Sequence, residues 1–284
     1  MEVKGKMILI GGAIKIEYAA DVTGESKSLD ILSQILLKAT KVIDSRIEIV
    51  TVASDIKEAS FKHYRDAFFL RGAKNCRHLV LNNKSDVMSK EATDRLDLAD
   101  ILFFTGGDQL KIISTIGGTH FHKKLIKRYR QDDFLYVGTS AGAAAVSATM
   151  IYGGENHEAL RKGMVEITGG LGLIDSLIID THFLVRGRVG RLFQSVVGNP
   201  MKVGIGLGED TAVIITDGKD IEVVGSGSVM VIDGHEVDDT NLSRIAMNEP
   251  MSAKRLITHV LSRGDKFDLK TCTPFLKISQ FNEG

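Results

Sequence analysis

Tryptophan is absent from this 284-residue chain, which also holds only two cysteines and three prolines. Cys76 and Cys272 are too few for a disulfide scaffold or a four-ligand zinc site, and they favour a reducing, cytoplasmic compartment. Neither sign of charge predominates, because 36 Lys and Arg residues balance 36 Asp and Glu residues, so general nucleic-acid binding lacks electrostatic support. The N-terminal apolar run at 7–10 is too short for a signal-peptide core or a membrane span.

The rest of the composition is typical of a globular protein, with 43% hydrophobic and 25% charged residues. In the first half, short apolar segments typical of buried strands alternate with amphipathic helical patterns. The strand-like segments are 7–10, 47–52, 78–81, 101–104 and 135–137, with helical patterns at 54–71 and 89–98. This alternation predicts an α/β fold with a mainly parallel sheet, and such sheets carry their chemistry at the carboxyl ends of the strands.

The pattern changes after about residue 170, where apolar segments follow one another closely. These strand-like segments are 176–179, 203–207, 211–215, 221–224 and 229–232. Asp217-Gly218 and Asp233-Gly234 are typical of hairpin turns, and the pattern at 252–261 favours a helix. We expect a β-rich, antiparallel extension over about 211–284 that belongs to the same single catalytic domain, spanning 1–284.

One apolar segment runs into the sequence Gly-Thr-Ser-Ala-Gly at 138–142 and then into small residues. This is the Gly-x-Ser-x-Gly pattern of a nucleophile elbow, a sharp turn between a strand and a helix. Gly138 and Gly142 lack the Cβ atoms that would block so close an approach. The pattern predicts Ser140 as a nucleophile, with the backbone N–H of Ala141 available to bind an oxyanion. The alternative is a glycine-rich turn that only packs a helix against a sheet.

Paired glycines also follow the segment 101–104, in the sequence Thr-Gly-Gly-Asp-Gln at 105–109. The backbone N–H groups of this turn, with that of Gly107 among them, can complete an oxyanion hole. Gln109 begins the next helix and can hydrogen-bond a substrate. The alternative is a plain turn at Gly106-Gly107 in which Asp108 caps the helix.

A serine nucleophile needs a base, and eight histidines compete for this role. His182 follows the apolar segment 177–180, which delivers it to a strand end. His259 is the rival, because α/β-hydrolases carry their histidine near the C-terminus, although its own pattern is helical. His120 and His122 precede a basic helix and are expected at the surface, without the further ligands that a metal site needs.

The base must be oriented by an acid, and the glycine-interrupted segment 203–207 leads to Glu209 and Asp210. Either carboxylate can hold the second nitrogen of an imidazole. Adjacent side chains on an extended chain point in opposite directions, so we expect only one of the two to face the site.

Three arginines follow the His182 segment, namely Arg186, Arg188 and Arg191. Guanidinium groups bind carboxylates in a bidentate manner, so these residues can recognise an acidic substrate. Arg188 and Arg191 are three positions apart and share one face if the segment is helical. The alternative is a solvated helix surface.

Several separated motifs combine into a more specific pattern. They are Phe-Thr-Gly-Gly-Asp-Gln at 104–109, Gly-Thr-Ser-Ala-Gly-Ala at 138–143, Asp-Thr-His-Phe at 180–183 with Arg-Gly-Arg at 186–188, and Gly-Ile-Gly-Leu-Gly-Glu-Asp-Thr-Ala at 204–212. Together they closely resemble the cyanophycinases, serine peptidases grouped with the aspartyl dipeptidases. The resemblance spans roughly residues 5–235, with the motifs in the order of the family.

The resemblance implies a three-layer α/β sandwich like that of the class I glutamine amidotransferases, with a serine in place of their nucleophilic cysteine. It further implies Ser140 as nucleophile, His182 as base and Glu209 as orienting acid. It implies no metal or organic cofactor, and it suggests a homodimer. The order Ser, His, Glu differs from that of α/β-hydrolases, but a triad is defined by its geometry and not by its order.

The implied substrate is cyanophycin, a polyaspartate whose β-carboxyl groups carry arginine and which the family cuts into β-Asp-Arg dipeptides. Gln109, Asp180, Arg186 and Arg188 match positions that line the substrate pocket of the family, and Arg191 is expected to join them. Asp180 would receive the substrate guanidinium, and the arginines would receive its carboxylates.

One residue departs from the family pattern, because Thr181 stands where a glutamine is expected between Asp180 and His182. A pocket contact is thereby lost, which bears on polymer specificity more than on catalysis. Three alternatives stay open: an aspartyl dipeptidase acting on short peptides, an esterase that pairs Ser140 with His259, and a binding protein that keeps the fold without the activity.

Overall fold

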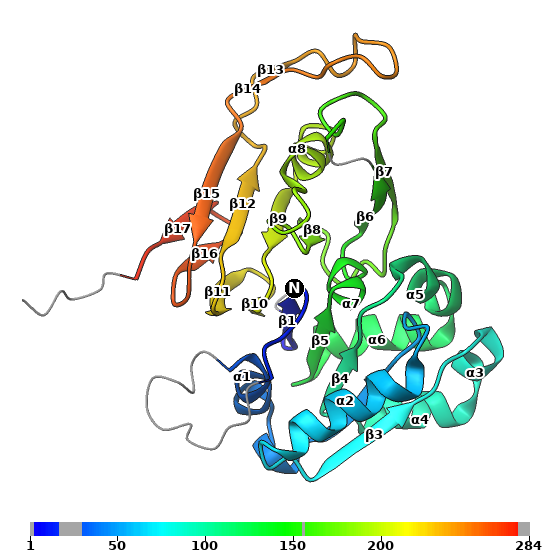
Figure 1. The fold of residues 1–284 in the computed structure, drawn as a ribbon. Coiled ribbons are helices and arrows are strands. Elements are labelled where there is room, and N and C mark those ends of the chain that lie inside the picture. The colour runs from blue at the N-terminus through cyan, green and yellow to red at the C-terminus, as the bar shows by residue number, and fades with distance from the viewer. Residues whose placement is uncertain (1–2, 17–29, 155–156, 278–284) are drawn as a thin grey trace, which may run out of the picture.

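A mixed sheet of nine strands runs through the centre of the protein (Figure 1). The computed structural model describes residues 3–16, 30–154 and 157–277. In spatial order the strands are β17 (Thr273–Phe275), β16 (Lys266–Asp268), β11 (Asp220–Gly225), β10 (Thr211–Thr216), β1 (Lys6–Ile10), β5 (Leu135–Thr139), β4 (Ile101–Phe104), β2 (Arg46–Val50) and β3 (Asn75–Leu79). The pairings from β1 to β3 are parallel, and those from β1 to β17 are antiparallel. The predicted α/β class, with a mainly parallel sheet and an antiparallel extension, is confirmed.

Helices cover both faces of the parallel part and make the predicted three layers. They are α1 (Ile31–Lys38), α2 (Lys57–Phe69), α3 (Lys84–Met88), α4 (Lys90–Leu98), α5 (Gln109–Ile116), α6 (His120–Gln131) and α7 (Ala141–Ala144), with a 3₁₀ turn at Val42–Asp44. Along β1, Met7 and Leu9 pack into the core shared with α3 to α7, whereas Ile8 and Ile10 pack into the core shared with α1 and α2. Because neighbouring side chains of a strand point to opposite faces, a strand buried on both faces is a continuous apolar run.

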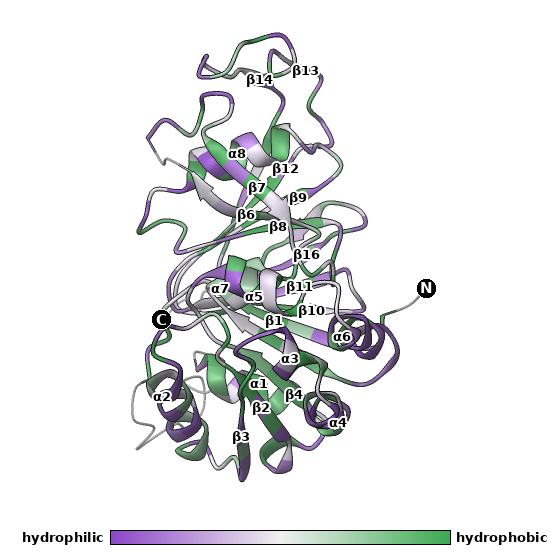
Figure 2. Cartoon of the chain, turned by 90° about the vertical axis from the view of Figure 1, so that its right-hand side faces the viewer, coloured by the Kyte–Doolittle hydropathy of each residue, from purple (hydrophilic) through white to green (hydrophobic). Residues whose placement is uncertain are grey.

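Hydropathy follows these layers (Figure 2). Strands β1 and β4 are largely hydrophobic, whereas the edge strand β3 is mostly polar and much of α2 and α6 is hydrophilic on the outside of the molecule. Within the described residues, no helix combines the length and apolar character needed to cross a membrane.

A second sheet of four strands lies beside the first, a division that the sequence pattern did not predict. Its order is β15 (Ile257–Leu261), β12 (Val229–Asp233), β9 (Val203–Leu207) and β8 (Leu177–Thr181), of which only β8 and β9 are parallel. Helix α8 (Val189–Val197) packs on β9. A Cβ on Gly204 would lie 2.7 Å from Val196 of this helix, so this glycine of β9 lets α8 approach closely.

Two small hairpins complete the described elements. They are β6 (Thr149–Gly154) with β7 (Val165–Gly169) and β13 (Asp239–Thr240) with β14 (Ala253–Lys254). The predicted turn at Asp217-Gly218 is confirmed, because it joins β10 to β11 with φ angles of 53° and 68°, as a type I′ turn requires.

Two local predictions were wrong. Segment 252–261 is not a helix but contains β14 and β15, and Arg255 between them has a φ of 65°, which a right-handed helix does not accept. Asp233-Gly234 is not a hairpin turn, because β12 pairs with the distant strand β15. In segment 252–261, the pairing of β15 with β12 overrides the weak helical pattern of the sequence.

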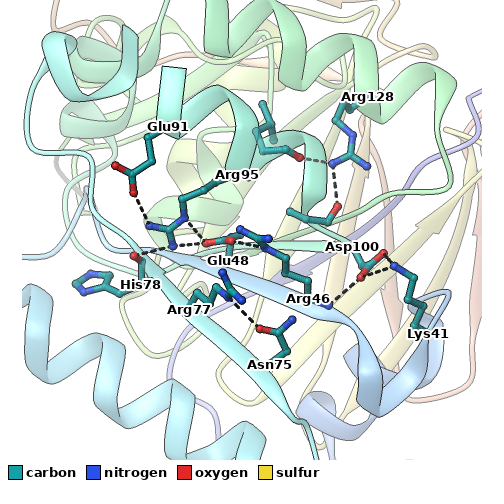
Figure 3. Close-up of polar contacts among 12 residues, drawn as sticks. Lys41, Arg46, Glu48, Asn75, Arg77, His78, Glu91, Arg95, Asp100 and Arg128 are labelled. Atoms are coloured by element: carbon teal, nitrogen blue, oxygen red, sulfur yellow. Dashed lines mark hydrogen bonds and ion pairs between the residues drawn. The ribbon is translucent and has the colours of Figure 1, made fainter. Parts of the chain in front are cut away.

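A buried carboxylate holds the far edge of the large sheet together (Figure 3). Glu48 of β2 is fully buried and receives hydrogen bonds from Arg46 Nε at 2.8 Å and Arg95 Nε at 3.1 Å. Arg95 also donates to the carbonyl of His78 at 2.8 Å. This network ties α4 to β2 and β3 by satisfying a charge that the core could not otherwise hold.

Candidate active site

Ser140 stands between β5 and α7 in a strained backbone conformation, with φ 50° and ψ −109°. A non-glycine residue with positive φ is uncommon and persists only where its surroundings impose it. The backbone N–H of Ser140 donates to the carbonyl of Ile10 at 2.9 Å. A Cβ on Gly142 would lie 2.6 Å from the carbonyl oxygen of Phe104, and one on Gly138 would overlap Gly142. Both glycines of the motif are therefore needed for the turn to pack on the sheet.

His182 reaches this serine from the end of β8. Its Nε2 lies 2.7 Å from Ser140 Oγ, and its Nδ1 lies 2.5 Å from Glu209 Oε1. The residue has a φ of 52°, and its backbone N–H donates to the carbonyl of Gly11 at 2.6 Å. The structure thus brings together, in one hydrogen-bonded row, the three residues that the family resemblance implies as nucleophile, base and acid.

As expected, only one of Glu209 and Asp210 faces the site, but the two residues lie in a turn after β9, where Asp210 has a φ of 48°, and not on an extended chain. Glu209 faces His182, whereas Asp210 accepts hydrogen bonds from the backbone N–H of Lys15 at 3.0 Å and from Ser226 Oγ at 2.5 Å. Asp210 therefore holds the loop together and takes no part in the row.

The loop after β1 is a part of the site that sequence analysis missed. The backbone N–H of Ala13 donates to Glu209 Oε2 at 2.5 Å, so Glu209 bridges this loop and His182. A Cβ on Gly12 would overlap the Glu209 carboxylate and lie 2.6 Å from His182 Nδ1. The only sequence signal was the Gly11-Gly12 pair at the end of an apolar run, whose partners lie about 200 positions away.

The Gly106-Gly107 turn lies against the serine. A Cβ on Gly106 would lie 3.3 Å from Ser140 Cβ, and Gly107 has a φ of 139°. Ala141 is the first residue of α7, so its N–H has no partner within the helix. Gln109 is oriented toward β6, because its Nε2 donates to the carbonyl of Ile151 at 3.1 Å.

Asp180 and Arg191 are placed differently from our expectation of direct substrate contact. Asp180 is 2% exposed, and Arg191 clamps it with Nε at 2.6 Å from Oδ2 and Nη2 at 2.5 Å from Oδ1. Arg191 itself is 5% exposed. A buried carboxylate held by two hydrogen bonds from one guanidinium has no oxygen open to a substrate guanidinium. Both residues are corrected from substrate ligands to a buried ion pair between β8 and α8.

The other two arginines lie closer to solvent. Arg186 is exposed, and Arg188 donates from Nη1 to the carbonyl of Thr181 at 2.7 Å, with Asp180 Oδ1 at 3.5 Å. Burial, reinforced by the charge of Arg191, lowers the pKa of Arg188 to about 10. This value is still far above neutrality, so the guanidinium remains cationic. Thr181 is buried.

The competing histidines lie elsewhere. His259 is on β15 with its ring 5.9 Å from that of Phe267. His120 is exposed, and His122 is half-buried with Nε2 2.6 Å from the carbonyl of Leu171. The geometry therefore leaves His182 as the histidine paired with Ser140.

Comparisons with known proteins bear on the family of this chain. The model of peptidase family S51 matches residues 19–223. The cyanophycinase of Geminocystis herdmanii is 32% identical over 235 residues, covering 83% of this chain and 86% of that protein. The cyanophycinase of Thermosynechococcus vestitus is 31% identical over 268 residues, covering 94% and 80%.

Two solved structures share the fold. A peptidase from an acI-B1 actinobacterium superposes with a TM-score of 0.65 at 16% identity, covering 94% of this chain and 97% of that one. A putative peptidase E protein from Listeria monocytogenes gives 0.51 at 17% identity, covering 77% and 97%. The family match and the sequence identity to its relatives show that this chain belongs to peptidase family S51.

Proposed function

We propose that this protein acts as a cyanophycinase, a serine-type exopeptidase that hydrolyses cyanophycin to β-Asp-Arg dipeptides through an acyl-enzyme. The observation that carries the proposal is the hydrogen-bonded row, with 2.7 Å between Ser140 and His182 and 2.5 Å between His182 and Glu209. The relatives named cyanophycinase match most of this chain, and their name supports cyanophycin as the substrate.

In the proposed cycle, Ser140 Oγ attacks an aspartyl backbone carbonyl while His182 Nε2 takes its proton. A His182 ring protonated at Nδ1 donates to Glu209, which stabilises the imidazolium as it forms. His182 then gives the proton to the departing amine, and water attacks the acyl-enzyme through the same base. Nucleophile, base and acid are held by the ends of β5, β8 and β9.

The oxyanion of each tetrahedral intermediate would accept hydrogen bonds from the backbone N–H groups of Ala141 and Gly107. The support is positional, since Ala141 opens α7 and the Gly106-Gly107 turn lies against Ser140. The strained turn at Ser140 serves as a nucleophile elbow. Each such donor is worth about 3 kcal/mol in the transition state.

Substrate carboxylates are the natural partners of Arg186 and Arg188, with Gln109 at the edge of the pocket. Arg186 is exposed and Arg188 remains cationic. The buried Asp180–Arg191 pair joins β8 to α8 on either side of residues 182–188, and we propose that it does not contact the substrate. We further propose that residues 1–284 act as one catalytic unit.

The resemblance to the family supports a homodimer, and the two cysteines, both free, fit a cytoplasmic location. Sedimentation velocity and localisation of a tagged chain measure these two properties directly.

The test is incubation of the protein with insoluble cyanophycin, following turbidity and the release of β-Asp-Arg. The native protein should clear the suspension, and Ser140→Ala should not, although it should unfold at the same temperature. Clearing by a properly folded Ser140→Ala variant would refute the mechanism.

A second candidate is an aspartyl dipeptidase, which is favoured by Thr181, a short, buried residue beside His182 at the position where the family pattern has a glutamine. Soluble aspartyl dipeptides in the same assay separate the two. Their hydrolysis with no clearing of the polymer would establish the dipeptidase, while release of β-Asp-Arg from the polymer establishes the first proposal.

A further inference from the structure

Three side chains of different chemistry meet at the C-terminal end of β12. Asp233 ends this strand, His235 follows it, and Cys272 immediately precedes β17. One donor atom from each lies within 4.8 Å of those of the other two. His235 Nδ1 is 2.5 Å from Asp233 Oδ1 and 3.6 Å from Cys272 Sγ. A carboxylate, an imidazole and a thiol thus surround one point.

The geometry of this cluster differs from that of a catalytic triad. In a triad the nucleophile and the acid bind opposite nitrogens of the imidazole. Here Asp233 and Cys272 both face Nδ1 of His235. Two acidic groups that converge on the same nitrogen can share a cation with it but cannot pass a proton across the ring.

The distances suit a tetrahedral ion. With Zn–S of about 2.3 Å and Zn–N of about 2.0 Å, tetrahedral angles place the sulfur and nitrogen ligands about 3.5 Å apart. The observed separation of Cys272 Sγ and His235 Nδ1 is 3.6 Å. Asp233 Oδ1 now shares a proton with Nδ1, and it would retreat by about 0.8 Å when the metal replaces that proton.

The charges and the exposure also fit. A divalent cation is neutralised by one carboxylate and one thiolate, so the site would carry no net charge. Asp233 has a side chain only 6% exposed, whereas the His235 side chain is 39% exposed. The solvent side leaves room for water as a fourth ligand. Among common divalent metals, zinc is the one that thiolate, imidazole and carboxylate favour together.

We propose that Asp233, His235 and Cys272 bind one zinc ion that stabilises the C-terminal part of the chain. Asp233 belongs to the four-stranded sheet, and Cys272 lies between β16 and β17 of the nine-stranded sheet. The ion would therefore join the two sheets (Figure 1). Asp233 pairs with Val203, the first residue of β9. Glu209 of the triad comes after Leu207, the last residue of β9. The site lies at the opposite end of β9 from the triad, so the ion would take no direct part in the reaction at Ser140.

The test uses untagged protein freed of metal with a chelator, which is then removed. One equivalent of Co²⁺ should produce cysteinate-to-cobalt charge-transfer absorption, and Zn²⁺ should displace it at one ion per chain by elemental analysis. Zn²⁺ should also raise the unfolding temperature. The matched control is Cys76→Ser, which removes the only other cysteine and should leave all three results unchanged.

Cys272→Ser should abolish the absorption, and His235→Ala should weaken Zn²⁺ binding by more than the roughly 100-fold that loss of an outer-shell partner costs. Both variants should lose the thermal shift. Failure of the native protein to take up zinc would overturn the proposal, as would equal uptake by Cys272→Ser. Neither result depends on hydrolysis of cyanophycin.

Discussion

Asp180 and His182 lie two positions apart at the end of one strand, yet they belong to regions of opposite character. His182 joins the row with Ser140 and Glu209, in which the Glu209 side chain is 30% exposed. Asp180 is 2% exposed and is held by Arg191 from α8. Protons can move along the first group of contacts, whereas the second is a fixed charge pair inside the core. Burial and partner, more than residue type, separate a reactive carboxylate from a structural one.

The comparison predicts that changes in the row reduce the rate, and that changes in the buried pair reduce the stability. The largest effect is expected from His182→Ala, which removes the group that we propose accepts the Ser140 proton. The rate of β-Asp-Arg release should fall by at least about 10⁴-fold, while the midpoint of urea unfolding should stay nearly unchanged. The control is His259→Ala, which should retain most of the activity. If His259→Ala abolished the activity and His182→Ala kept it, His259 on β15 would be the base.

The next effect is expected from Asp180→Asn, which leaves Arg191 as an uncompensated buried charge. We expect a loss of about 3–5 kcal/mol in the free energy of unfolding, measured by urea denaturation. Asp175→Asn is the matched control, because this acid pairs with Lys202 at the surface and should cost less than about 1 kcal/mol.

Turnover per folded molecule of Asp180→Asn should stay within a few-fold of the native value. If stability were unchanged and substrate affinity fell instead, Asp180 would be a substrate ligand, and the distinction between the two regions would fail.

A smaller effect on the rate is expected from Gly12→Ala, because the added methyl group displaces Glu209 from His182. The obstacle is the end of a flexible side chain, so the fold should adapt while kcat falls by roughly 100-fold. Gly169→Ala, at a position with nothing within 4 Å of the added Cβ, is the control. An unaffected kcat for Gly12→Ala would show that the Glu209 contact tolerates displacement.

The smallest effect is expected from Arg186→Ala. An exposed guanidinium–carboxylate contact is worth up to about 1 kcal/mol, so KM should rise by about 5-fold with kcat preserved. Arg130→Ala, at an exposed position of α6, should leave both parameters unchanged. A fall in kcat would place Arg186 at the reacting bond and extend the reactive region beyond the row.

Sequence analysis was most successful where neighbouring residues decide the conformation. The apolar runs of β1, β4 and β5 need only burial on both faces of a sheet, while the positive φ angles at Asp217-Gly218 and the close approach of Gly138 to Gly142 arise between residues near one another in the chain. It failed at 252–261, where a distant partner strand overrides local preference, and it missed Gly12 because the obstacle to a side chain there comes from Glu209.

By itself, the sequence determined the α/β class, the turn that presents Ser140, and the order of strand ends that carry His182 and Glu209, because periodicity and glycine placement act over a few residues. Only the tertiary structure decided that Asp180 is withdrawn into a pair with Arg191, that Ala13 anchors Glu209, and that Cys272 meets Asp233 and His235. Each of these depends on the burial and approach of residues from separate elements, and no local pattern encodes such distances.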